Sequence, residues 1–326
     1  MLEKFFAVAS NTFTETLRQP VFGVILAISV GLLALTPSLI MFTLDDDNLL
    51  LKDIGLSTLL VAGLIIGVFT SASVVSDEIE NKTTLTVISK TVSRPLFIVG
   101  KFFGIAAAVI LSQYILSIVL MMIVRHGVIY AVRVKHDMVV IVLGIAALAL
   151  TFILGLLGNY FYRWRFSSFA IFLAAIFATL ILILLSFLDP TWSYGPLKDN
   201  LPWELLPPIT LIVLAIIILT AVSMVAATRF NLTMSLFICV MIFILGIMLE
   251  NWLGPGSRNP NSFWDYLAWI PLTIIPSISF FVVTNVIYEE SIIPLSYIAQ
   301  SALYACFYVT ACLMFAIAMF QRREIG

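Results

Sequence analysis

The chain has 326 residues, of which 62% carry hydrophobic side chains and only 11% carry charged ones, and its formal net charge is -1. This composition excludes an ordinary soluble domain, and the lack of a basic excess argues against a nucleic acid as partner. The apolar runs are long and do not alternate with a period of two, so the lipid-spanning segments are expected to be α-helices. The predicted fold class is an all-α polytopic membrane protein with a single transmembrane domain over residues 1–326.

The first 20 residues predict an amphipathic helix that lies on the membrane surface. Apolar residues recur there at three- and four-residue spacings, with Glu15 and Arg18 among the polar residues between them. Pro20 is expected to end this helix before the first span, at about residues 21–43. The apolar run is too long for a signal peptide and lacks a small-residue cleavage site, so the segment is expected to be retained.

Seven further spans are predicted, each long enough to cross a hydrocarbon core of about 30 Å. A connector with four aspartates, residues 45–53, is expected before the second span, and a Gly- and Pro-rich loop, residues 251–261, after the seventh. The third of the eight spans begins near residue 95 or residue 101 and ends at about residue 124. The others lie at about residues 54–75, 138–160, 168–188, 208–227, 232–249 and 295–320.

Residues 263–287 are apolar enough for a ninth span but contain Pro271 and Pro276. With a full crossing here, the acidic pair that follows, Glu289 and Glu290, would lie on the inner side. The basic C-terminus would then lie outside. We therefore expect a re-entrant pair of short helices on the outer side.

The distribution of basic residues predicts the orientation of the chain. With eight spans and both termini inside, most of the 17 lysines and arginines fall on the inner side, as cytoplasmic loops require. Arg163 and Arg165, which flank Trp164, are then expected to anchor the inner interface. The basic connector 125–137 is an exception, because this orientation places it outside. Five tryptophans are then expected on the outer side, as in an interfacial belt: Trp192, Trp203, Trp252, Trp264 and Trp269.

The spans carry no acidic or basic residue near the membrane centre, which argues against a carrier coupled to an ion gradient. The sequence has no phosphate-binding GxxxxGK(S/T) motif and no HExxH motif. Its three cysteines and two histidines lack the spacing of metal ligands, so no metal site is predicted. Gln113 is the clearest mid-membrane polar side chain, and an interhelical hydrogen bond is its expected role, with substrate contact as the alternative.

The longest polar stretch is residues 76–101, which joins the second and third spans. Asp77 and Glu80 have the spacing of a capping box, so a short helix is predicted from about residue 78 to 89. Ser93, Arg94 and Pro95 predict a second helix start. Because the chain has no nucleotide-binding motif of its own, this stretch is interpreted as a docking element for a partner that supplies energy; a solvated loop is the alternative.

The same stretch resembles the permease subunits of ABC transporters of the ABC-2 type, also called type V exporters. The residues that follow the order of that family are Glu78, Thr83, Leu85, Ser89, Lys90, Val92, Ser93, Arg94, Gly100 and Lys101. The opening of the chain is also similar, with Glu15, Leu17, Arg18 and Pro20 before the first span. Two positions depart from the family: Lys82 stands where glycine is common, and Thr91 where proline is. Eight spans rather than six indicate an enlarged subgroup.

The resemblance implies an elbow helix (residues 1–20, with Glu15, Arg18 and Pro20), a coupling connector (77–98) and an outer re-entrant segment (263–287). It implies that the residues that dock the ATPase are Glu78, Glu80, Lys82, Thr83, Thr84, Leu85, Lys90 and Arg94. Pro95, Gly100 and Lys101 would return the chain to the membrane.

The implied partners are an ATP-binding cassette subunit, which would hold ATP and Mg, and a second permease chain, identical or related. The chain itself would be no enzyme but a subunit that exports or translocates a hydrophobic or amphiphilic substrate across the bacterial inner membrane, with both termini cytoplasmic. A gradient-driven carrier or channel, and a membrane scaffold for the assembly of other proteins, are the alternatives.

Overall fold

The computed structural model describes residues 2–40, 47–80, 93–128, 137–195, 200–258, 269–283 and 293–321. Within these ranges the regular structure is helical, apart from an isolated bridge between Leu188 and Tyr194. The elements are α1 (Leu2–Arg18), α2 (Pro20–Leu39), α3 (Asp47–Glu80), α5 (Arg94–His126), α6 (Met138–Tyr162), α7 (Phe166–Phe187), η2 (Trp203–Leu205), α8 (Leu206–Ala227), α9 (Leu232–Arg258), α11 (Trp269–Ile274), η3 (Ile278–Phe281) and α13 (Leu295–Gln321).

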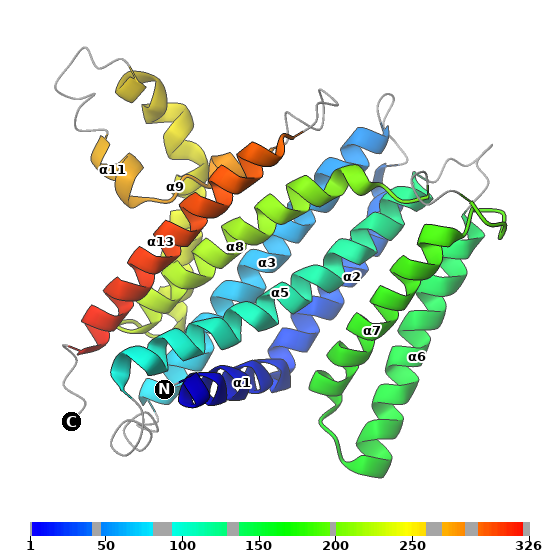
Figure 1. Cartoon of the computed structure of the whole chain (residues 1–326), viewed down its shortest axis with the longest axis horizontal. Coiled ribbons are helices and arrows are strands. Elements are labelled where there is room, and N and C mark those ends of the chain that lie inside the picture. The colour runs from blue at the N-terminus through cyan, green and yellow to red at the C-terminus, as the bar shows by residue number, and fades with distance from the viewer. Residues whose placement is uncertain are drawn as a thin grey trace.

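In the described part of the chain, eight helices are long and apolar enough to cross a membrane: α2, α3, α5, α6, α7, α8 with η2, α9 and α13. The predicted fold class, an all-α polytopic membrane protein, is confirmed at this level. The eight helices run alternately up and down in Figure 1, so α1 and the end of α13 lie at the same end of the bundle. Helix α1 lies across that end instead of running along the bundle.

Helices α3, α5 and α8 form the centre of the bundle, and the α3–α8 pair has the most extensive contact. Two glycines on α3 permit this close approach. A Cβ atom at Gly63 would lie 2.1 Å from Cδ1 of Ile216, and one at Gly67 would lie 2.5 Å from Oγ1 of Thr220. The Ser223 hydroxyl of α8 also donates a hydrogen bond to the Val68 carbonyl, at 3.0 Å. Small residues and interhelical hydrogen bonds are what hold helices together where lipid removes the hydrophobic driving force.

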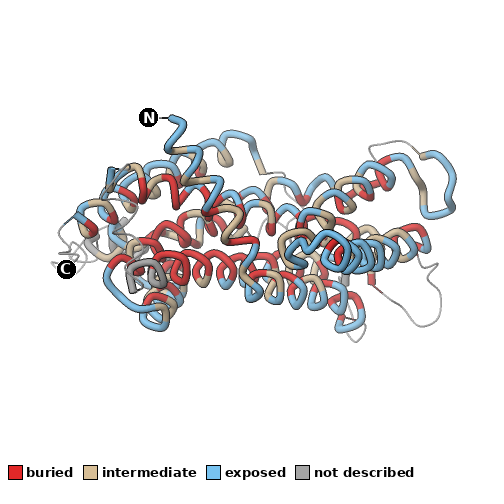
Figure 2. The backbone as a smooth tube through the Cα atoms, turned by 90° about the horizontal axis from the view of Figure 1, so that it is seen from below, coloured by how far each residue is buried: buried red, intermediate tan, exposed pale blue. Residues whose placement is uncertain are grey.

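Helices α6 and α7 form a hairpin at one edge of the bundle and pack chiefly against each other. Much of their surface is exposed, as the pale sections of the tube in Figure 2 show. The exposed residues are apolar, among them Ile145, Phe152 and Ile176. Since both helices are apolar all round, this face suits the hydrocarbon of a bilayer.

Residues 269–283 contain a six-residue helix, α11, and a 3-10 turn, η3, and no helix that could span a membrane. Three tyrosines of α13 hydrogen-bond to this irregular backbone. The hydroxyls of Tyr297 and Tyr308 donate to the carbonyls of Phe280 (2.6 Å) and Ile274 (2.8 Å). The N–H of Ser277 donates to the Tyr304 hydroxyl at 3.2 Å. Irregular backbone at membrane depth requires such partners, because lipid offers none.

Two predicted boundaries are wrong. Helix α3 begins at Asp47, so Lys52 and Asp53 belong to its first turns and not to a connector. Helix α9 continues to Arg258 through most of the predicted Gly- and Pro-rich loop. In both places the polar or glycine-rich composition predicts a loop, but composition does not decide where a helix that is already formed ends.

Candidate functional site

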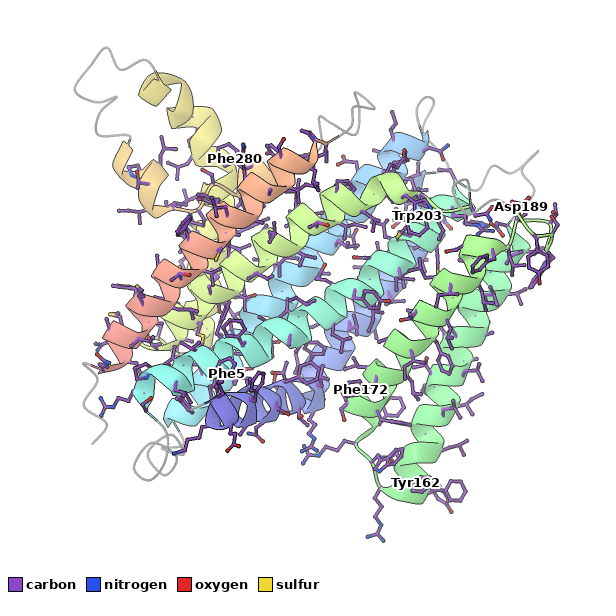
Figure 3. All side chains as sticks on the ribbon, in the orientation of Figure 1. Phe5, Tyr162, Phe172, Asp189, Trp203 and Phe280 are labelled. Atoms are coloured by element: carbon purple, nitrogen blue, oxygen red, sulfur yellow. The ribbon has the colours of Figure 1, made fainter. Side chains whose placement is uncertain are left out.

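The candidate site is the end of the bundle at which α1, the last turn of α3, the first turn of α5 and the last turn of α13 come together. Figure 3 shows Phe5 of α1 at this end, beside α5, with Trp203 at the opposite end. Helix α3 ends at Glu80 and α5 begins at Arg94. The polar connector between them therefore leaves and re-enters the bundle here.

No helix begins at Asp77. The backbone of α3 continues without interruption through Asp77, Glu78 and Glu80, so the predicted capping box is wrong. The sequence between Ile54 and Glu80 contains no proline, and nothing local ends the helix before its last residue. Of the other predicted docking residues, several lie outside the described residues: Lys82, Thr83, Thr84, Leu85 and Lys90.

The predicted second helix start is confirmed. Ser93 is extended, with φ of -72° and ψ of 146°, and α5 begins with Arg94 and Pro95. The N–H of Phe97 donates to the Ser93 carbonyl at 3.0 Å. Proline fits the first turn because its missing N–H has no partner within the helix there.

Two arginines hold the C-terminal end of α13 at this site. Nη1 of Arg94 donates to the carbonyl of Gln321 at 3.0 Å, and Nη2 of Arg229, in the turn between α8 and α9, donates to the carbonyl of Met319 at 3.1 Å. The last four carbonyls of a helix lack partners within it, and a guanidinium supplies both hydrogen bonds and favourable charge. Arg94 therefore links the start of α5 to the last span.

The predicted re-entry residue Gly100 contacts α1, and so does Gly104 one turn later. A Cβ atom at Gly100 would lie 2.9 Å from a methyl of Val8, and one at Gly104 would lie 2.5 Å from the backbone oxygen of Ala9. Sequence reasoning missed Gly104, although the GxxxG spacing with Gly100 is the usual signal for close helix packing. These two glycines let α1 lie directly on the backbone of α5.

Lys101, the other predicted re-entry residue, is buried at 2% exposure. Its Nζ lies 5.2 Å from the centroid of the Phe97 ring, within the range of a cation–π contact. Phe97 in turn stacks on Phe320 of α13, with ring centroids 6.2 Å apart. The start of α5 and the end of α13 are thus joined by an aromatic contact as well as by Arg94.

The junction of α1 and α2 is hydrogen-bonded to two other helices, α3 and α7. The Ser73 hydroxyl of α3 donates to Oε1 of Gln19 at 3.3 Å, and the Ser167 hydroxyl of α7 donates to the Leu17 carbonyl at 3.1 Å. Of the predicted elbow residues, Arg18 and Pro20 are exposed and Glu15 is half-buried. The helix packs on the bundle through its buried Thr12, Thr16 and Leu17.

At the opposite end of the bundle, the structure gives Arg125 a role that the sequence did not reveal. Its Nε donates to Oδ2 of Asp137 at 2.9 Å, and its Nη atoms donate to the carbonyls of Leu185 (2.6 Å) and Leu188 (2.7 Å). Asp137 also accepts hydrogen bonds at Oδ1 from the first turn of α6. This arginine joins α5, α6 and α7, so its charge is neutralised by protein and carries little information about topology.

The expected interhelical hydrogen bond of Gln113 is contradicted. The side chain is fully buried, yet neither Oε1 nor Nε2 has a hydrogen-bond partner among the residues that the structure describes. A buried amide usually finds at least one partner. Its position is taken up below.

No protein-family model matches the chain, and no curated protein matches its sequence.

Proposed function

We propose that this chain is the membrane permease subunit of an ATP-driven transporter of the ABC-2 type, with both termini in the cytoplasm of a bacterial cell. One observation carries the proposal: the polar connector joins the ends of α3 and α5, two central spans, at the end of the bundle where α1 lies. A soluble partner bound to this connector can act on both central helices at once. The resemblance of residues 78–101 to the coupling region of that family supports the same assignment.

In this proposal α1 is the elbow helix, residues 77–98 are the coupling connector, and residues 263–287 are the outer re-entrant segment. ATP and Mg bind to a separate cassette subunit, and a second permease chain completes the complex. Closure of the cassettes pushes on the connector and tilts the spans that flank it. The hydrogen bond from Arg94 to the carbonyl of Gln321 passes part of this movement to α13. The substrate is a hydrophobic or amphiphilic molecule.

The charge distribution within the spans supports a chemical energy source over an ion gradient. Helices α2, α6, α7, α8 and α13 contain no Asp, Glu, Lys or Arg. On α3 and α5 the charged residues lie within about two turns of a helix end, as Asp53 and Lys101 do. A coupling ion needs a charged or strongly polar site near the membrane centre.

The test is purification of the tagged chain from its own membranes in mild detergent, followed by measurement of ATP hydrolysis. We expect an ATP-binding chain to be recovered in a fixed ratio with the permease. Replacement of residues 81–92 by a Gly- and Ser-rich linker of equal length should release it. The matched control substitutes outer-connector charges, Asp45→Ser and Asp46→Ser, and should leave the complex intact.

Two results would contradict the proposal. One is recovery of the intact chain without any ATPase, and the other is substrate flux that persists in ATP-free vesicles. Flux that follows a proton or sodium gradient would favour a carrier or channel. Loss of complex assembly without any change in ATPase rate, on substitution of Glu78 and Arg94, would favour a membrane scaffold.

A further inference from the structure

The amide of Gln113 lies in the contact between the three central helices. It belongs to α5, and a Cβ atom at Gly63 of α3 would lie only 2.6 Å from its Nε2. The same Cβ would lie 2.1 Å from Ile216 of α8. The amide therefore occupies space that the missing side chain of Gly63 leaves between α3 and α8. We name this region, defined by Gln113, Gly63 and Ile216, the central seam.

The hydroxyl groups of Ser112, Ser117 and Thr220 each donate their hydrogen to a carbonyl of their own helix and not to the amide. The hydroxyls of Ser112 and Ser117 donate to the carbonyls of Val109 (2.7 Å) and Gln113 (2.6 Å), and that of Thr220 donates to its own helix at Ile216 (2.7 Å). Among the described residues, both polar atoms of the amide remain without a partner. Burying such a group raises the free energy of this arrangement relative to one in which the amide is solvated or bound.

We propose that the central seam opens during transport and that Gln113 is then the polar contact for water and for the substrate. The proposal rests on the transport function proposed above and adds a residue and a substrate chemistry to it. An amide both donates and accepts hydrogen bonds, so it suits hydroxyl, ester or amide groups. The closest charged residues on α5, Lys101 and Arg125, are each twelve positions away, or about 18 Å along the helix. The recognised group is therefore uncharged and belongs to an amphiphile.

Opening of the central seam can be measured by thiol labelling. The three native cysteines are first replaced by alanine, and Gln113→Cys is compared with Ala108→Cys, a fully buried position on another face of α5. A water-soluble maleimide reacts with the thiolate, so its reaction reports on hydration of the site. In membrane vesicles, with and without ATP, we expect the cysteine at 113 to react at least tenfold faster than that at 108. Equal protection of both positions in every condition would overturn the proposal.

A stability measurement tests the premise without any partner subunit. If the amide has no partner in the closed state, Gln113→Leu should raise the melting temperature of the purified chain by about 2–4 °C. The control Leu116→Gln places an amide at another fully buried position and should lower it. A fall in melting temperature for Gln113→Leu would mean that the amide is paired, and the proposal would fail. Absence of an ATPase in the purified complex would count against the proposed energy source but would leave both of these measurements interpretable.

Discussion

Arg125 at the end of α5 and Asp137 before the first turn of α6 form a buried ion pair, with Nε and Oδ2 2.9 Å apart and each side chain only 5% exposed. The pair sits at the edge of a sequence segment whose basic residues suggested an exposed, charged connector. Its remaining hydrogen bonds, to Leu185 and Leu188, fasten the peripheral α6–α7 hairpin to the central helices.

Breaking this pair should destabilise the protein strongly. Arg125→Gln leaves the carboxylate of Asp137 buried without its counter-ion, and the removal of one partner of a buried pair costs about 3–5 kcal/mol. The measurement is thermal unfolding of the purified chain in detergent. The control is Lys52→Gln, which removes the pair with the exposed Glu204, where solvent screens the charge, and should cost less than the loss of Arg125. Similar losses for the two variants would mean that the Arg125 pair is not effectively buried.

The packing of α1 on α5 should depend on Gly104. In Gly104→Val the new side chain meets the backbone of Ala9, which cannot yield as a flexible side chain would, so a loss of about 1–3 kcal/mol is expected. Release of α1 can be followed by limited proteolysis of the first 20 residues. Gly31→Val is the matched control, because a Cβ atom there meets nothing within 4 Å. If both variants resist protease equally, the contact does not hold α1.

The irregular segment 269–283 should depend on the tyrosines of α13. Tyr308→Phe removes the donor to the carbonyl of Ile274 and leaves that carbonyl with one hydrogen bond fewer, at a cost of about 1–3 kcal/mol. Hydrogen exchange of residues 269–283 should become faster while α5 and α8 remain protected. Tyr160→Phe, at a side chain that is 80% exposed, should have no effect. Unchanged exchange in the Tyr308 variant would show that the segment is held by apolar packing alone.

The turn between α6 and α7 should favour anionic lipid. Arg163 and Arg165 are exposed there beside Trp164, which stacks on Tyr162 with ring centroids 4.9 Å apart. Interfacial aromatic residues and basic residues anchor a helix end at the headgroups, and each basic residue near an anionic surface contributes about 1 kcal/mol. The unsubstituted chain should therefore have a higher melting temperature in nanodiscs of phosphatidylglycerol than in nanodiscs of phosphatidylcholine. The double variant Arg163→Gln, Arg165→Gln should lose this difference. A lipid dependence equal to that of the unsubstituted chain would contradict this assignment.

Several features of the fold could be predicted from the sequence because they depend on composition over many residues. Long apolar runs give spanning helices whatever their neighbours are, and all eight predicted spans are present. The start of α5 was also predictable, since Ser93, Arg94 and Pro95 act locally. The predicted capping box at Asp77 was wrong because capping residues mark a helix start only where the preceding helix has already ended. Here α3 continues through Asp77 to Glu80.

The sequence by itself therefore determined that this is a helical membrane protein, and it predicted the eight long apolar helices that the described residues form and the polar connector between the second and third of them. Only the tertiary structure decided which spans are central, because α6 and α8 are equally apolar and differ only in what packs against them. It also decided that Arg94 holds α13 and that Arg125 pairs with Asp137. It placed Gln113 in the central seam, where its amide has no hydrogen-bond partner among the described residues. Each of these depends on contacts between residues that are far apart in the chain, which no local pattern encodes.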